Sequence, residues 1–304
     1  MNKLELKGII PAPIVPMTKD YEIDEDDLRN YIHWLLEQEP EGVAINVDTG
    51  EGVHLYPEER NKVIRIWAEE IRGEIPIIAG LGASFTKQGI DLAKDAKEAG
   101  ADAVLVFPIP VYQGTTLDPE IPFQYHKAIA EEADIPLVLF RLQKALAGKE
   151  YEIETIEKLI KIEGVVAIKE ATFNAVKFKE LSSFLKGSNI SLLTGNDNFL
   201  YESFLLGANG GLLGIGALGI KELKAMQKSV KERNYEIGLN VSDKFQPFSD
   251  FIFSTPVRDY RARIKEALVI MGVIKNSFVR PPLLPLKAEE KEKIKREMIR
   301  AELL

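Results

Sequence analysis

The chain has 304 residues, 45% hydrophobic and 28% charged, which is the composition of an ordinary globular protein with a large core. It contains no cysteine, which excludes disulfides, thiolate metal sites and cysteine nucleophiles. The net charge of −8 argues against a nucleic-acid partner, because phosphate binding requires a basic surface. No apolar run approaches the roughly 18 residues of a membrane helix, and the charged N-terminal stretch does not match a secretory leader. We therefore expect a cytoplasmic protein that does not bind membranes.

Short aliphatic runs alternate with amphipathic, charged stretches along the first 233 residues. The predicted strands are residues 9–15, 42–47, 75–79, 103–107, 136–140, 165–168, 191–194 and 211–215. The predicted helices are residues 25–38, 57–71, 86–99, 119–132, 152–162, 173–186, 197–206 and 219–233. This alternation predicts parallel βαβ units in an α/β protein. Eight near-equal units favour a closed (β/α)₈ TIM barrel over an open doubly wound sheet, since such barrels have roughly 250 residues.

The last part of the chain has a different pattern. It carries no strand signal, and its predicted helices lie near 235–247, 258–272 and 287–302. We therefore predict a barrel over residues 1–233 and a C-terminal helical extension over residues 234–304, packed on the barrel.

The sixth predicted strand carries the clearest chemical signal, Gly-Val-Val-Ala-Ile-Lys-Glu-Ala-Thr at residues 164–172. Active sites of barrels lie at the C-terminal ends of the strands. Lys169 ends an apolar run there, and strand alternation sends Lys169 and Glu170 to opposite faces. A lone strand-end lysine is commonly a solvent contact, but an apolar lining favours the neutral amine that attacks carbonyl groups. In the barrel context we predict that Lys169 is a nucleophile.

Two turns can be explained in either of two ways. Hydroxyl and N–H groups of the turn at residues 48–51 could hold a substrate carboxylate, and a helix cap with a glycine turn accounts for the same residues. The turn at residues 194–197 leaves the same choice. The GxGxxG pattern at residues 214–219 lacks the acidic residue that a dinucleotide site places after the next strand. We interpret it as a loop whose backbone approaches a small substrate.

No motif predicts a metal site. The three histidines lack ligand spacing, so only carboxylates of Asp48, Glu51 and Asp197 could hold Mg²⁺.

Several segments together resemble the dihydrodipicolinate synthase/N-acetylneuraminate lyase family across essentially the whole chain. They are residues 8–17, 49–51, 80–82, 168–172, 194–197 and 279–286. The resemblance implies a class I aldolase-type lyase that forms a Schiff base between Lys169 and pyruvate or another 2-oxo acid. It implies no cofactor, and commonly a homo-oligomer, either a dimer or a tetramer. It also implies substrate-binding residues at Thr49, Gly50, Phe140, Arg141, Gly195 and Leu212.

The chain departs from the family at the positions that handle protons. Phe140 stands where the family has its catalytic tyrosine, and Asp48 replaces the first threonine of the family's GTTGE turn. The family's tyrosine pair falls on residues 110–111, and a slip of one residue would bring in Tyr112. No arginine lies at residues 142–147, where the synthase binds its second substrate, although Arg141 or Lys144 could substitute. We therefore assign proton transfer to Asp48 or Tyr112.

Three hypotheses follow. The first is a lyase that cleaves, condenses or dehydrates a 2-keto-3-deoxy sugar acid or related compound. The second is a family paralogue that binds a 2-oxo acid or a protein partner without turnover, because Phe140 cannot transfer a proton. The third is a metal-assisted lyase that uses carboxylates.

Overall fold

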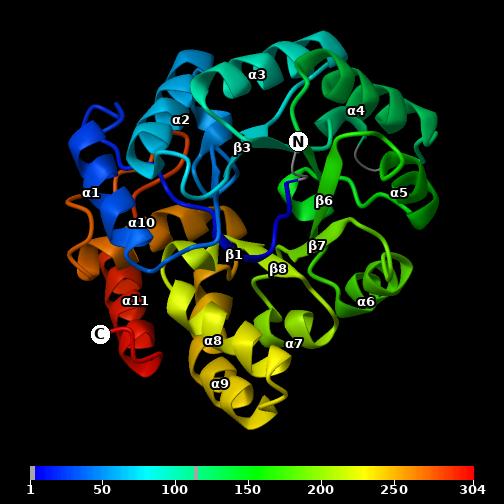
Figure 1. Ribbon diagram of the computed structural model, residues 1–304. Coiled ribbons are helices and arrows are strands. Elements are labelled where there is room, and N and C mark those ends of the chain that lie inside the picture. The colour runs from blue at the N-terminus through cyan, green and yellow to red at the C-terminus, as the bar shows by residue number, and fades with distance from the viewer. Residues whose placement is uncertain (1–3, 113–115) are drawn as a thin grey trace.

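The structure is a computed structural model that describes residues 4–112 and 116–304, and it places eight parallel strands inside a ring of helices (Figure 1). The strands are β1 (Gly8–Pro11), β2 (Val43–Ile45), β3 (Ile77–Leu81), β4 (Ala103–Val106), β5 (Leu137–Leu142), β6 (Val165–Ala171), β7 (Ser191–Thr194) and β8 (Gly210–Leu213). Seven parallel pairings give the order β1-β8-β7-β6-β5-β4-β3-β2. The N–H of Glu41, just before β2, donates to the carbonyl of Ile9 at 3.0 Å and brings the two edges together. The predicted (β/α)₈ barrel is confirmed.

A helix follows each strand on the outside of the barrel. These helices are α1 (Glu25–Leu36), α2 (Pro57–Ile71), α3 (Thr86–Ala99), α4 (Glu120–Ala133), α5 (Ile153–Leu159), α6 (Ala175–Phe184), α7 (Leu200–Leu205) and α8 (Ile220–Lys231). Apolar residues on alternate sides of each strand divide the core into two clusters. One cluster lies between strands and helices, and the smaller one fills the barrel interior with side chains such as Ile10, Val138 and Leu193.

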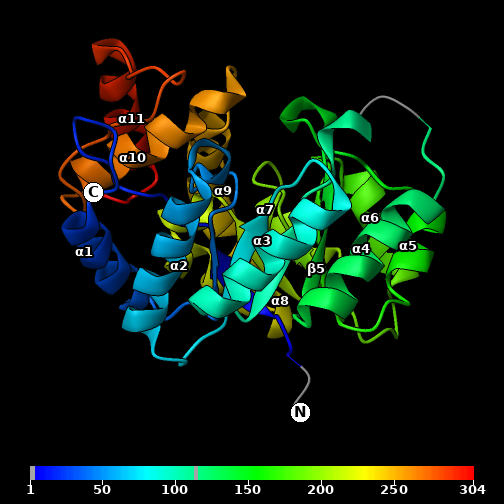
Figure 2. The same ribbon diagram turned by 90° about the horizontal axis from the view of Figure 1, so that it is seen from above.

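Three further helices complete the chain: α9 (Tyr235–Ile252), α10 (Tyr260–Ile270) and α11 (Ala288–Arg300). In Figures 1 and 2, α10 and α11 lie at one edge of the barrel, beside α1. Contacts between α10 and the loop after β2 place this late segment beside the strand ends where the site was predicted.

Several boundaries differ from the predicted ones, and three of the differences are the largest or bear on the site. β1 ends at Pro11, because Pro11 and Pro13 have no N–H to continue a ladder. β6 continues through Lys169 to Ala171, so the lysine lies within a paired strand. α9 continues past Pro247, which lacks an N–H for the helical hydrogen bond, and ends at the buried Ile252.

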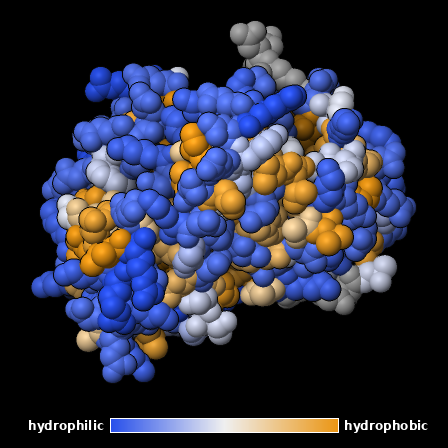
Figure 3. Space-filling view, turned by 90° about the horizontal axis from the view of Figure 1, so that it is seen from below, coloured by the Kyte–Doolittle hydropathy of each residue, from blue (hydrophilic) through white to orange (hydrophobic). Residues whose placement is uncertain are grey.

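Over the residues that the structure describes, no helix is both long and apolar enough to cross a bilayer. The face shown in Figure 3 is largely hydrophilic, with separate groups of apolar side chains.

Candidate active site

Lys169 projects from β6 into the interior of the barrel. It lies on the same side of the strand as Ala167 and Ala171, which belong to the interior apolar cluster. Across the sheet it pairs with Phe140 of β5 and Leu193 of β7. Only 9% of the residue is exposed. The lysine therefore has the desolvated setting that a carbonyl-attacking amine requires.

Burial controls the protonation of Lys169. Desolvation lowers its pKa to about 8, even though the charges of Asp197 and Asp48 act in the opposite direction. The Nζ atom lies 4.6 Å from the centroid of the Phe140 ring, which attracts a cation but cannot accept a proton. A pKa of about 8 leaves a substantial share of neutral amine near neutral pH.

Phe140 and Leu212, two predicted substrate-binding residues, are apolar parts of the barrel interior. Phe140 is buried and meets the edge of Phe107 at a centroid distance of 5.0 Å. Leu212, on β8, is also buried in the interior cluster. Both can exclude water from an adduct on Lys169, and neither can transfer a proton.

The loop after β7 wraps closely around the lysine. A Cβ atom at Gly195 would lie 2.5 Å from Cε of Lys169, so any larger residue there would displace the lysine side chain. Asn196 holds this loop against β6: its Nδ2 donates to the Glu170 carboxylate at 2.6 Å, and its Oδ1 accepts from the N–H of Phe173 at 2.7 Å. The structure thus brings Gly195 next to Lys169, and Asn196 has a structural role.

Asp197 follows in the same loop and is 5% exposed. Its Oδ1 accepts from the N–H of Ile215 at 3.0 Å, and its carbonyl accepts from Gln246 and Ser249 of α9 at 2.9 and 2.7 Å. Burial raises the pKa of Asp197 to about 6, against the opposing effects of the Ile215 N–H and the charge of Lys169. The sequence left this residue as part of a substrate-binding turn, as a helix cap or as a magnesium ligand, and the effect of the Lys169 charge on it appears only in the folded chain.

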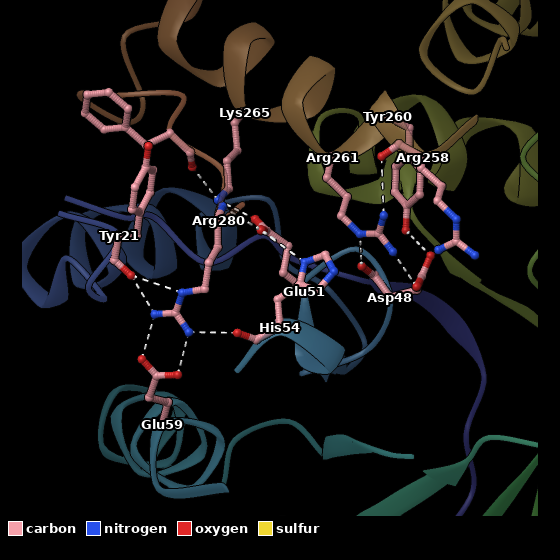
Figure 4. A network of polar contacts seen from close by, with 11 residues as sticks. Tyr21, Asp48, Glu51, His54, Glu59, Arg258, Tyr260, Arg261, Lys265 and Arg280 are labelled. Atoms are coloured by element: carbon pink, nitrogen blue, oxygen red, sulfur yellow. Dashed lines mark hydrogen bonds and ion pairs between the residues drawn. The ribbon is translucent and has the colours of Figure 1, made fainter. Parts of the chain in front are cut away.

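Asp48 is held by two residues of the C-terminal helices (Figure 4). Arg261 donates to Oδ1 at 2.5 Å and to the Asp48 carbonyl at 2.7 Å, while the Tyr260 hydroxyl donates to Oδ2 at 2.8 Å. Burial and the charge of Asp48 raise the pKa of Tyr260, so its hydroxyl stays protonated and donates. No local pattern in the sequence indicates that Tyr260 and Arg261 contact Asp48.

The rest of this turn is structural. Glu51 forms a fully buried ion pair with Lys265 of α10 at 2.5 Å (Figure 4). Arg280 donates to the carbonyl of His54 and pairs with Glu59 at 2.7 Å. A Cβ atom at Gly50 would lie 3.0 Å from the carbonyl oxygen of Pro13, so this glycine permits close packing.

Two predicted site residues lie elsewhere. Arg141 follows Phe140 on β5, so strand alternation turns it outward, and it donates to the carbonyl of Lys177 on α6 at 3.2 Å. Its placement does not support the prediction that it binds substrate inside the barrel. Tyr112 packs, partly buried, against the outer apolar cluster, where it contributes to raising the pKa of Tyr125 and Tyr151. Residues 113–115 beside it lie outside the described residues.

A cavity of about 370 Å³ opens beyond the C-terminal ends of β2 to β5. Its wall includes Asn46, Asp48, Arg60, Phe107 and Arg258. Phe107 in this wall meets the ring of Phe140, the residue that pairs with Lys169 across the sheet, although Lys169 itself does not line the cavity. A larger open depression of about 650 Å³ lies on the outside along α6 and α7, away from this chemistry.

Within residues 4–112 and 116–304 no group of three or more potential metal-binding side chains is present. Two of the three carboxylates that could have held Mg²⁺ are instead bound by cations, Asp48 by Arg261 and Glu51 by Lys265.

A (β/α)₈ barrel with a buried lysine of lowered pKa on its sixth strand has the architecture of a lyase of the class I aldolase type. Comparison with known proteins identifies the family. The model of the dihydrodipicolinate synthetase family matches residues 5–301, and the chain belongs to this family. The predicted resemblance and the predicted enzyme class are thereby confirmed.

Individual relatives agree with this membership. The chain is 32% identical over 290 residues to a 4-hydroxy-tetrahydrodipicolinate synthase of Coxiella burnetii, covering 95% of this chain and 96% of the relative. It is 33% identical over 292 residues to the enzyme of the same name from Persephonella marina, covering 95% and 96%. A crystal structure of the chloride-inhibited dihydrodipicolinate synthase from Acinetobacter baumannii complexed with pyruvate has a TM-score of 0.87 at 29% identity, covering 98% and 99%. The N-acetylneuraminate lyase from Mycoplasma synoviae shares the fold, with a TM-score of 0.82 at 22% identity over 97% of each chain.

Proposed function

We propose that the chain forms an imine between Nζ of Lys169 and C2 of a 2-oxo acid and then cleaves, forms or dehydrates a 2-keto-3-deoxy sugar acid or a related compound. The observation that carries this proposal is the lysine itself, 9% exposed within the barrel and with its pKa lowered to about 8. An imine supplies the electron sink for all of these reactions, so no organic cofactor or metal is required.

An acidic substrate agrees with the surroundings of the lysine. Of the described residues that line the 370 Å³ cavity, Asp48 is the only acidic one, whereas Arg60 and Arg258 are cationic. Arg261 compensates the charge of Asp48. Thr49 and the backbone of Gly50 and Gly195 are our candidates for binding the carboxylate of the substrate. A relative of this chain has been crystallised with pyruvate, the simplest of these acids.

The synthase reaction itself is not the activity we propose. Phe140 occupies the position of the family tyrosine, and Arg141 turns away from the barrel interior. We propose that the protein works in the cytoplasm as a homo-oligomer, which would also cover exposed apolar side chains such as Val111 and Val176.

The decisive experiment is intact-mass spectrometry after incubation with pyruvate and borohydride. A reduced adduct on the wild type and none on Lys169→Ala is the expected result. The rate of trapping should rise as the pH increases through about 8, because deprotonation of Lys169 produces the attacking amine. No adduct with pyruvate or a panel of 2-oxo acids would refute the proposal.

The second candidate function is binding of a 2-oxo acid or a protein partner without turnover, and it is favoured by Phe140 alone. Adduct formation without cleavage or dehydration of any 2-keto-3-deoxy sugar acid would support it over a lyase.

A further inference from the structure

Two arginines line the cavity that opens beyond the C-terminal ends of β2 to β5. Arg60 belongs to α2, and Arg258 belongs to the 3₁₀ helix η5 (Val257–Asp259), which precedes α10. Nε of Arg60 donates to the carbonyl of Leu55 at 3.2 Å. Within the part of the chain that the structure describes, neither arginine forms an ion pair. Both guanidinium groups are therefore available to an anion in the cavity.

The one acidic side chain among the described residues of this wall already has its own cation. The Asp48 carboxylate pairs with Arg261 at 2.5 Å, and its other oxygen accepts from the Tyr260 hydroxyl at 2.8 Å (Figure 4). Since Arg261 compensates Asp48, the charges of Arg60 and Arg258 remain as an excess of positive charge at the cavity. Such an excess attracts an anionic ligand.

Asn46, directly after β2, adds a hydrogen-bond acceptor to the same wall. The residue is 5% exposed, and its Nδ2 donates to the carbonyl of Arg60 at 2.9 Å, whereas its Oδ1 has no partner among the described residues. Its φ is 55°, and Cβ atoms at Gly52 and Gly80 would lie 1.9 and 2.3 Å from its carbonyl oxygen. A buried acceptor without a donor is costly, and strained backbone of this kind is concentrated at ligand sites. A ligand hydroxyl group would supply the missing donor.

The cavity lies close to the lysine but does not include it. Nζ of Lys169 is 4.6 Å from the centroid of the Phe140 ring, which lies 5.0 Å from the centroid of Phe107 in the cavity wall. Neither Lys169 nor Phe140 lines the cavity, so a group bound there is not the group that reacts at the amine. The volume of about 370 Å³ is sufficient for a small ligand, since such pockets begin at roughly 300 Å³.

We propose that this cavity binds an acidic group, a phosphate or a carboxylate, at the far end of the substrate, with Arg60 and Arg258 as its cations. This inference rests on the proposed function, because the near end of the same molecule is the 2-oxo acid that Lys169 holds. Guanidinium groups suit both anions, since their N–H groups form paired hydrogen bonds with either. Asn46 accepts from a hydroxyl group between the two ends. The substrate is then a sugar acid that ends in a phosphate or a second carboxylate, not in a hydroxyl group.

The test compares three 2-oxo acids that differ only at the far end. The acid 2-oxoheptanoate ends in a methyl group, 2-oxoheptanedioate in a carboxylate and 6-phosphono-2-oxohexanoate in a phosphonate. Borohydride trapping and intact-mass spectrometry give the concentration of each acid that modifies half of the protein in a set time. This concentration should be about 10-fold or more lower for an acid with an anionic end, because charge-assisted hydrogen bonds are strong. The anionic acid with the lower value identifies the preferred group.

Substitutions show whether the arginines cause this preference, expressed as the ratio of the half-modification concentrations of the neutral and the anionic acid. Arg60→Gln and Arg258→Gln should each reduce the ratio toward one, and Arg60→Lys should keep part of it, because lysine retains the charge without the paired hydrogen bonds. Arg258 is exposed, so its substitution leaves the core intact. The matched control is Arg65→Gln, an exposed residue of α2 outside the cavity, which should keep the wild-type ratio.

Each outcome decides the inference. A preference for an anionic end that is reduced in both glutamine variants supports it. Equal half-modification concentrations of the three acids overturn it and leave the proposed imine intact, and so does a preference that survives both substitutions. Adducts with pyruvate but with none of the longer acids also overturn it, because the cavity would then not admit a chain attached to Lys169. No adduct with any 2-oxo acid overturns the proposed function and the inference together.

Discussion

At the scale of single residues, Lys169 and Asp197 show what it costs a protein to bury ionisable groups. Folding removes both groups from water, which disfavours their charged forms and moves their pKa values toward each other. Each shift reduces the stability of the folded state at neutral pH. Desolvation therefore causes both the shifted pKa values and the loss of stability.

We expect Lys169→Met to raise the free energy of unfolding at pH 7 by about 1–3 kcal/mol. The folded pKa of about 8 lies below the unfolded value of 10.5, so the wild type bears this cost below pH 8. The difference between variant and wild type should disappear as the pH rises through 10.5, where the unfolded lysine also loses its proton. Urea unfolding of the variant and the wild type at several pH values measures this difference in the free energy of unfolding.

The control for this prediction is Lys19→Met, which changes an exposed lysine and should leave stability nearly unchanged. A Lys169→Met protein that is less stable than the wild type at pH 7 would contradict the proposed origin of the low pKa.

At the scale of elements, α10 fixes the loop that follows β2. Its first two residues, Tyr260 and Arg261, hold Asp48, and Lys265 one turn later holds Glu51. The loop therefore owes its position to a helix more than 200 residues away in sequence. Without these contacts Asp48 and Thr49 would have no fixed orientation toward the barrel interior.

Lys265→Met should destabilise the protein by about 3–5 kcal/mol, because it leaves the Glu51 carboxylate buried without its cation. The double variant Glu51→Gln/Lys265→Met should recover much of this loss, since no buried charge remains. Chemical unfolding of the two single variants and the double variant completes the cycle. Equal losses of stability in Lys265→Met and in the double variant would show that lost packing, and not the unpaired charge of Glu51, causes the destabilisation.

At the scale of the whole molecule, the C-terminal helices act as part of the barrel. Removing α9 to α11 would expose Glu51 and the barrel surface on which the buried α9 residues Phe245 and Phe248 pack. We expect the chain shortened to residues 1–233 not to reach a native barrel, as shown by loss of a cooperative thermal transition in circular dichroism.

The chain shortened to residues 1–286 is the matched comparison, because it lacks α11 alone. It loses the burial of Ile294 and Met298, roughly 3–6 kcal/mol, and the ion pair of Arg263 with Glu290. It should unfold at a lower temperature and still form the pyruvate adduct. A cooperative thermal transition of the chain shortened to residues 1–233 would show instead that the C-terminal extension is a separate unit.

Patterns that are local in the chain were sufficient to predict the order of elements and the burial of Lys169 at the end of an apolar strand. The periodicities of strands and helices depend on residues close together in the chain. The apolar residues that precede Lys169 form the same buried strand, so they already indicate that the lysine is buried. The prediction was weaker for turns that have two possible roles. The turns of Asp48 and Asp197 allowed the same two explanations, and only the groups around each aspartate in the folded chain distinguish them.

The sequence by itself determined the barrel, the family and the lysine, because each depends on residues close together along the chain. Only the tertiary structure decided that Arg141 points outward, that Arg261 neutralises Asp48 and that the charges of Lys169 and Asp197 act on each other. The side of a strand that faces the interior is fixed by the register of the closed sheet. The acidity of a carboxyl group is fixed by burial and by charges that arrive from distant segments, as Arg261 reaches Asp48 across 213 residues of sequence.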